Sequence, residues 1–156
     1  MYVQYVRVKN YRSFTDVAMT FNEQANYLVG ENSIGKSSVL RLLSMLASGT
    51  GLEETDYADP SKPVVVIAAI VLHGEGERFV EEQDRQESKV RLRFEKKVEE
   101  ICPRLYNDEN GQMLPLNLIR RFRYIFHSSV MPEQHILTSH VHKLLESQLK
   151  ALCGTE

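Results

Sequence analysis

The sequence predicts an α/β fold in which a glycine-rich loop between a strand and a helix is combined with antiparallel strands and a helical C-terminal portion. Three observations support this fold class. Residues 30–37 match the pattern G-x-x-x-x-G-K-[ST] in full. Several segments alternate apolar and polar residues, as half-buried antiparallel strands do. The last third of the chain changes to the three- and four-residue spacing of amphipathic helices.

The first segments predict a hairpin that leads toward the loop. Residues 2–9 alternate apolar and charged side chains and predict a strand with one exposed face. Residues 10–13 read as a turn, and residues 17–21 alternate again. Residues 27–29, Tyr-Leu-Val, predict a short apolar strand that runs directly into Gly30.

After the loop, Val39, Leu42, Leu43 and Leu46 fall on one stripe of a helix. Residues 50–63 contain two prolines and several acids and predict a connecting loop.

Three further features predict more strands. Residues 64–72 are apolar throughout, which predicts a strand buried on both faces. Residues 90–94 alternate like a half-buried antiparallel strand. The pair Asn110-Gly111, flanked by apolar residues, indicates a hairpin turn.

Two helices are expected near the C-terminus, separated by Pro132. We therefore expect a single domain in three parts: a loop-containing core at 1–48, an antiparallel β subdomain at 49–115 and a helical segment at 116–156. A chain of 156 residues is long enough for one such domain.

Composition and charge exclude several classes of protein. The formal net charge of −2 provides no general field for binding nucleic acid or an anionic membrane. The longest apolar run has nine residues, 64–72, whereas a membrane-spanning helix needs about 20. The N-terminus lacks the pattern of a signal peptide. Cys102 and Cys153 form no ligand or disulfide pattern, so we expect free thiols and a cytoplasmic protein without a membrane partner.

The glycine-rich loop carries the chemistry. Gly30 and Gly35 allow the backbone to curl so that its N–H groups point at phosphate oxygens. Lys36 supplies a positive charge for the β and γ phosphates, and the Ser37 hydroxyl can bind Mg²⁺. The helix that follows directs its positive end at the same anion. These features predict binding of ATP with magnesium.

A second motif supports a family resemblance. Residues 8–14 read Val-Lys-Asn-Tyr-Arg-Ser-Phe, and residues 30–38 read Gly-x-Asn-x-x-Gly-Lys-Ser-Ser. Together, over residues 3–47, they resemble the N-terminus of the RecF, SMC and OLD group of ABC-type P-loop ATPases, closest to OLD-like and AAA-type ATP-binding proteins. The resemblance implies the first lobe of an ATPase head that acts on DNA, in repair or in defence against phage.

The resemblance also places the β-hairpin turn beside the nucleotide. The residues expected to bind the nucleotide are Arg12, Ser13, Gly30, Glu31, Asn32, Ser33, Ile34, Gly35, Lys36, Ser37 and Ser38, with Ser37 as the magnesium ligand. Gln83, Gln86 and Gln112 are candidates for the magnesium-contacting glutamine of such heads, and the sequence does not choose among them.

Departures from the family pattern limit the predicted activity. The signature motif, the strand ending in Asp-Glu and the downstream histidine of these heads do not occur in this sequence. We identify no catalytic residue, and the carboxylates that position water and magnesium are missing. The chain therefore reads as the front part of an ATPase, completed by a second protein segment or by a homo-oligomer.

Other functions are compatible with a P-loop. A GTPase would need an N-K-x-D motif, and a kinase would need a second substrate lobe; neither is visible. The remaining alternative is a nucleotide-sensing module that binds ATP without hydrolysing it and docks a partner protein.

Overall fold

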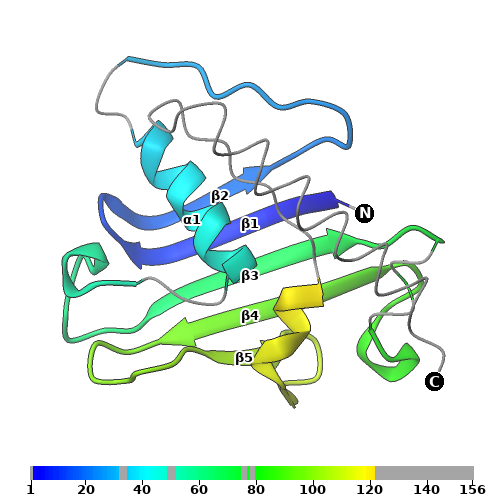
Figure 1. Ribbon diagram of the computed structural model, residues 1–156. Helices are drawn as coiled ribbons and strands as arrows, with labels where there is room; N and C mark the ends of the chain where they lie inside the picture. Colours follow the sequence, from blue (N-terminus) through cyan, green and yellow to red (C-terminus); the bar gives the residue numbers. More distant parts are fainter. Residues whose placement is uncertain (1, 32–34, 49–51, 75–76, 78–79, 122–156) are drawn as a thin grey trace, which may run out of the picture. The chain divides into compact units, whose positions relative to one another are not determined.

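The computed structural model describes residues 2–31, 35–48, 52–74, 77 and 80–121. These residues form one antiparallel sheet of six strands in the order β2-β1-β3-β4-β5-β6, with helix α1 across it (Figure 1). The strands are β1 Tyr2–Tyr11, β2 Phe14–Thr20, β3 Val64–Val71, β4 Lys89–Lys96, β5 Arg104–Asn107 and β6 Met113–Leu114. The helices are α1 Lys36–Ser48 and the short 3-10 helices η1 Glu54–Asp56, η3 Glu82–Asp84 and η4 Leu116–Arg121.

The predicted N-terminal hairpin is confirmed. β1 and β2 pair through a tight turn in which Tyr11 lies opposite Phe14. Arg12, in the turn, has a φ of 50°, a left-handed conformation that tight hairpin turns require. The alternating strand at 90–94 is also confirmed as part of β4, and the Asn110-Gly111 turn joins β5 to β6.

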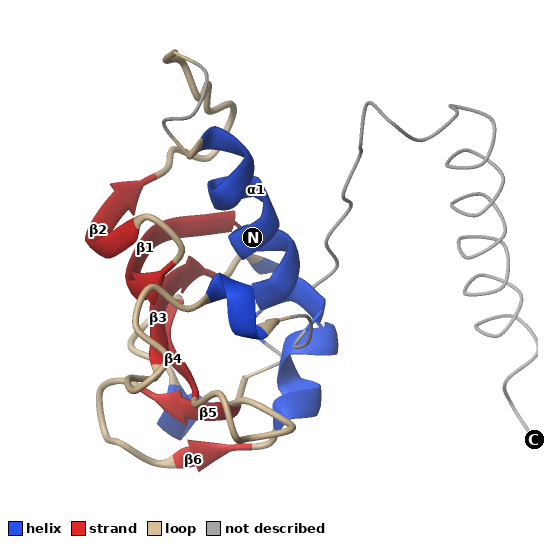
Figure 2. Cartoon of the chain, turned by 90° about the vertical axis from the view of Figure 1, so that its left-hand side faces the viewer, coloured by secondary structure: helices blue, strands red, loops and turns tan. Residues whose placement is uncertain are grey.

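The core lies between the sheet and α1. Figure 2 shows the described helix α1 on one side of the sheet. Val39 and Leu42 of the predicted helical stripe are buried, and Leu43 and Leu46 pack against the core as partly buried residues. Burying each such side chain contributes about 1.5 to 3 kcal/mol. The sheet contributes Val6, Val8, Val64, Val66, Leu92, Phe94 and Leu105.

The burial of β3 differs from the prediction that residues 64–72 are buried on both faces of the sheet. β3 lies between β1 and β4, but its burial alternates: Val64 and Val66 are buried, whereas Val65 and Ile67 are only half-buried. The predicted burial on both faces is therefore wrong. The physical reason is that, among the described residues, α1 covers one face of the sheet, so an antiparallel strand keeps one exposed face even when its sequence is entirely apolar.

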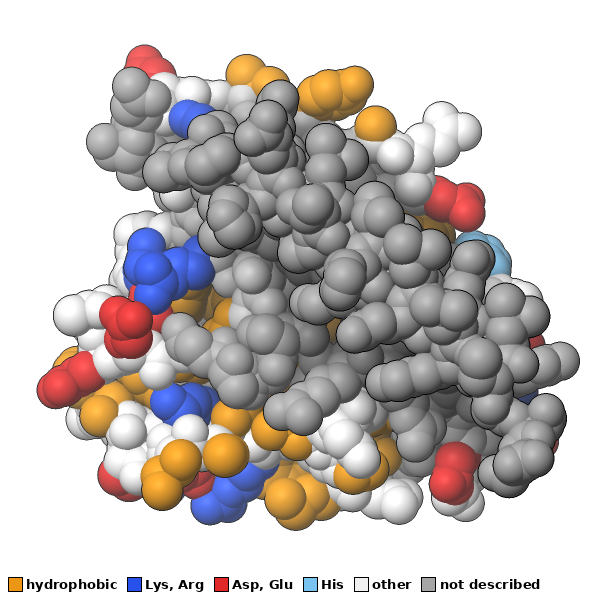
Figure 3. Space-filling model, viewed as in Figure 1, with side chains coloured by type: hydrophobic (Ala, Val, Ile, Leu, Met, Phe, Trp, Pro, Cys, Tyr) orange, Lys and Arg blue, Asp and Glu red, His pale blue; other side chains and the backbone are white. Residues whose placement is uncertain are grey.

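The expected strand at 27–29 is also wrong. These residues have no strand assignment, and the side chains of Tyr27 and Val29 are 87% and 90% exposed. A strand needs a neighbour for its backbone hydrogen bonds, and no described segment pairs with this one. Figure 3 shows hydrophobic side chains at the upper rim of the molecule, where the connection between β2 and α1 runs.

The C-terminal prediction is tested only at its start. η4 covers Leu116–Arg121, and the remainder of the two expected helices lies outside the described residues. The division of the chain at residues 48 and 115 stays a prediction, although β1, β2 and β3–β6 share one sheet. None of the described helices has the length and apolar character needed to cross a membrane.

Candidate nucleotide-binding site

The second half of the glycine-rich loop leads into the N-terminal turn of α1. The helix begins at Lys36, and the Val39 N–H donates to the Gly35 carbonyl at 3.0 Å, which closes the first turn. The N–H groups at the start of a helix have no partner within it, and the helix dipole gives this end a partial positive charge. Such an end binds a phosphate.

Lys36 lies over the start of the same loop. Its ammonium donates to the carbonyl of Gly30 at 2.6 Å and to that of Glu31 at 2.5 Å. The charge is therefore held at the loop backbone, and its predicted contact with the β and γ phosphates stays a prediction. Ser37 is exposed, whereas Ser38 is buried with 9% of its surface accessible. Ser37 is thus the more accessible hydroxyl for a metal ion bound with phosphate.

The rest of the loop lies outside the described residues. This applies to Asn32, Ser33 and Ile34, whose predicted contacts with the nucleotide stay predictions.

Phe14 shapes the loop, a role that the sequence reasoning did not assign. Gly35 has a φ of 99°, and a Cβ atom added there would lie 2.8 Å from Cζ of Phe14 and 3.7 Å from Oγ of Ser13. The hairpin turn therefore touches the phosphate-binding loop directly. The available signal was the place of Phe14 at the end of the motif at 8–14.

Arg12 is held by a buried carboxylate. Its Nε donates to Oδ1 of Asp56 at 2.6 Å, and its backbone N–H donates to the Asp56 carbonyl at 2.8 Å. The side-chain hydrogen bond with Asp56 raises the pKa of Arg12. Burial, with the nearby Asp56 carboxylate as a second cause, raises the pKa of Tyr11. Sequence reasoning missed Asp56, which sits among several acids in a segment read as a loop.

Asp56 also links the hairpin turn to the helix. Its Oδ2 lies 3.6 Å from Nη2 of Arg41 in α1 and accepts a hydrogen bond from the Glu53 N–H at 3.1 Å. The Asp56 side chain is completely buried. One carboxylate therefore joins η1, the turn of the β1–β2 hairpin and the helix that follows the phosphate-binding loop.

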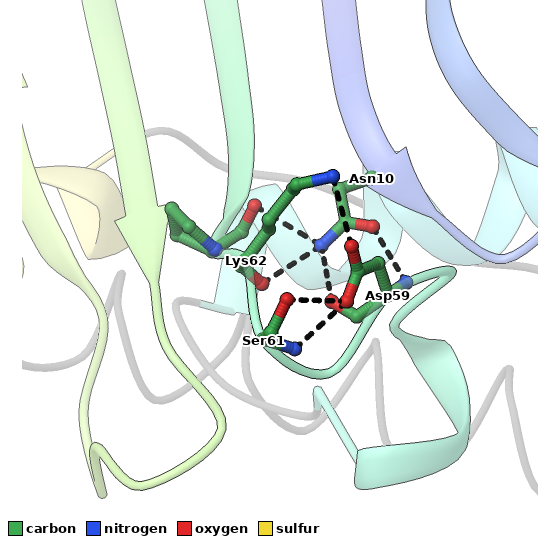
Figure 4. A network of polar contacts seen from close by, with 5 residues as sticks. Asn10, Asp59, Ser61 and Lys62 are labelled. Atoms are coloured by element: carbon green, nitrogen blue, oxygen red, sulfur yellow. Dashed lines mark hydrogen bonds and ion pairs between the residues drawn. The ribbon is translucent and has the colours of Figure 1, made fainter.

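Asn10 fixes the segment that follows Asp56 (Figure 4). Its amide donates to the carbonyls of Asp59 at 2.9 Å and Lys62 at 2.8 Å, and its carbonyl accepts from the Asp59 N–H at 2.7 Å. Asn10 has a φ of 58°, which asparagine tolerates better than most residues. The motif at 8–14 thus supplies a clamp (Asn10), an ion pair (Arg12) and a packing contact (Phe14).

The candidate magnesium-contacting glutamines remain undecided. Gln83, Gln86 and Gln112 are all exposed, and none has a described contact with the phosphate-binding loop. Within the described ranges, no group of three His, Cys, Asp or Glu side chains is arranged to hold a metal ion. The role of Ser37 as a magnesium ligand stays a prediction.

Comparisons with known proteins identify the family of the chain. A family model described as an AAA ATPase domain matches residues 1–148. The DNA replication and repair protein RecF of an Exiguobacterium species is 38% identical over 47 residues, 30% of this chain and 13% of the relative. RecF of Rhizobium rhizogenes is 30% identical over 69 residues, 44% of this chain and 17% of the relative. The chain thus corresponds to less than a fifth of these relatives' length.

Solved structures share the fold. A structure of SMC ATPases, from work on ATP-driven dimerization and DNA-stimulated activation, has a TM-score of 0.60 at 17% identity and covers 76% of this chain and 75% of that one. The structure of the recombination mediator RecF with ATP has a TM-score of 0.61 at 18% identity, over 82% of this chain and 32% of that one. With the family model spanning most of the sequence, the chain belongs to the AAA ATPase domain family, and its fold is similar to that of the SMC and RecF ATPases.

Proposed function

We propose that the chain binds ATP with Mg²⁺ at the loop before α1 and forms the front part of an ATPase head that acts on DNA. The observation that carries the proposal is the position of Lys36, whose ammonium bonds the carbonyls of Gly30 and Glu31 at the N-terminal end of α1. This arrangement concentrates a side-chain cation, a helix dipole and backbone N–H groups at one point, a combination suited to a triphosphate.

The role on DNA is supported by the relatives. RecF is described as a DNA replication and repair protein, and its similarity to this chain extends over 47 to 69 residues. That length is sufficient to include both the motif at 8–14 and the glycine-rich loop at 30–37. Within this role we favour repair or an OLD-like defence against phage. A duplex-binding assay with the assembled head, with and without ATP, tests this step.

The head requires completion by another segment or a second copy of the chain. Tyr27, Leu28 and Val29 form an exposed apolar stretch just before Gly30, and the described residues provide it with no strand partner. Exposed apolar side chains of this kind form a contact surface for another polypeptide segment. Tyr27 and Leu28 of this stretch also line a hollow together with Met19, Phe21 and neighbouring polar residues.

Calorimetry tests nucleotide binding. Lys36→Ala should weaken Mg-ATP binding by at least about tenfold, or about 1.4 kcal/mol, because the loop loses its cation. Lys97→Ala, which removes an exposed lysine after β4, is the matched control and should bind like the wild type. Equal affinity of the Lys36 variant and the wild type would contradict the proposal, and a clear preference for GTP would indicate a GTPase.

Measurements of ATP hydrolysis and of self-association test whether the ATPase head needs another segment or a second copy of the chain. The chain alone should turn over ATP negligibly, because positioned groups around the phosphate supply most of the catalysis in phosphoryl transfer. It should also self-associate, or bind a second polypeptide, through the surface around residues 27–29. Strong ATPase activity from a monodisperse monomer would contradict this. Binding without turnover, even in the completed assembly, would favour the nucleotide-sensing module.

A further inference from the structure

We propose that Asp56 is a positioning residue that orients the Arg12 guanidinium toward the nucleotide. The proposal rests on the proposed function, ATP binding at the loop, and extends it by a residue that no sequence motif marks. The completely buried carboxylate of Asp56 contacts Arg12 in the β1–β2 turn and Arg41 in α1.

Asp56 holds Arg12 at two points. The carbonyl of Asp56 accepts from the Arg12 backbone N–H at 2.8 Å, and its Oδ1 accepts from Nε at 2.6 Å. The first contact supports a turn residue in the left-handed conformation, with a φ of 50°. The second fixes the plane of the guanidinium, because a group bound at Nε can no longer rotate freely.

The remaining nitrogens of Arg12 are available for a ligand. In the part of the chain that the structure describes, the Arg12 side chain donates one hydrogen bond, from Nε to Oδ1 of Asp56. The Arg12 side chain is 32% exposed. A guanidinium held at Nε still presents its two Nη groups, which match the oxygens of a phosphate in a bidentate contact.

The turn is fixed next to the phosphate-binding loop by independent contacts. Ser13 and Phe14, the two residues after Arg12, approach Gly35. Arg41, in the second turn of α1, lies 3.6 Å from Oδ2 of Asp56. Arg12 is therefore attached between the loop and the first turns of the helix, and its direction depends on the carboxylate that it shares with Arg41.

A buried carboxylate could serve stability alone, and binding measurements separate the two roles. Asp56→Asn keeps the shape and an acceptor for the Glu53 N–H but weakens the hold on Nε. It should weaken Mg-ATP binding by about tenfold, as Arg12→Ala should. The double variant should bind no more weakly than Arg12→Ala alone, because Asp56 acts through Arg12.

One control uses a neighbouring carboxylate. Glu53→Gln changes a carboxylate that contacts Arg41 but is exposed. This variant should bind Mg-ATP within about twofold of the wild type, because the Glu53 side chain forms no described hydrogen bond or ion pair with Arg12. Additive losses in the Asp56 and Arg12 double variant would overturn the proposal.

A second variant leaves Asp56 in place in case Asp56→Asn does not fold. Arg12→Lys keeps the charge but loses Nε and the planar fork, so it should bind as weakly as Arg12→Ala. Wild-type affinity in Arg12→Lys, or in a folded Asp56→Asn whose melting temperature alone falls, would overturn the positioning role. Failure of the wild type to bind ATP would instead overturn the proposed function.

Discussion

Replacing Gly35 by alanine tests how closely the hairpin turn supports the phosphate-binding loop. Two costs add at this position. A φ of 99° lies outside the region that residues with a Cβ atom prefer, which costs about 1 to 3 kcal/mol. The new Cβ atom would also lie 2.8 Å from Cζ and 2.9 Å from Cε1 of Phe14, an overlap of the kind that costs about 1 to 3 kcal/mol.

Gly111→Ala is the matched control. Gly111 has a φ of 74° in the turn between β5 and β6, and a Cβ atom added there would meet nothing within 4 Å. Gly111→Ala therefore has only the cost of placing alanine at a positive φ, without an overlap with another side chain. The free energy of unfolding should fall by about 1 to 3 kcal/mol more in Gly35→Ala than in Gly111→Ala.

Urea denaturation followed by circular dichroism measures both variants, and Phe14→Leu provides a second comparison. The leucine side chain is shorter, so the double variant of Gly35 and Phe14 should recover about 1 kcal/mol relative to the sum of the single losses. If Gly35→Ala and Gly111→Ala lose equal stability and the double variant shows no recovery, the contact between Phe14 and the loop is not as the structure places it.

Two further predictions concern Asn10 and the segment that it binds, residues 58–63. Asn10→Ala removes the hydrogen bonds to Asp59 and Lys62, so the free energy of unfolding measured by urea denaturation should fall by about 2 to 3 kcal/mol. Asn10→Gly should lose less stability, because glycine accepts a φ of 58°, and equal losses would contradict the role of the backbone conformation. Hydrogen bonds from Ser61 and then Lys62 lower the pKa of Asp59 from 3.8 to about 2. Asp59 should therefore stabilise the fold above about pH 4 and lose this contribution as the pH falls toward 2. If the difference in stability between the wild type and Asp59→Asn stays constant over this range, the prediction is wrong.

Local patterns predicted much of the fold because they depend on residues close together in the sequence. The stripe from Val39 to Leu46 predicted α1, since a helix repeats its contacts every three or four residues. The alternation at 90–94 predicted β4, and Asn110-Gly111 predicted a hairpin turn. The same locality explains why the motif alone could predict roles for Lys36 and Ser37, because the loop pattern lies within eight consecutive residues.

The tertiary structure decided which of these segments meet. The sequence could not show that Val65 and Ile67 of β3 are only half-buried, because the burial of each face depends on which described elements, such as α1, pack against it. It could not show that residues 27–29 lack a partner among the described segments, because pairing depends on a neighbour elsewhere in the chain or outside it. Asp56 contacts Arg12 across 44 positions of sequence, through the order of strands and loops. The sequence alone identified the glycine-rich loop, whereas the packing of distant segments brought Phe14 against Gly35 and Asp56 against Arg12.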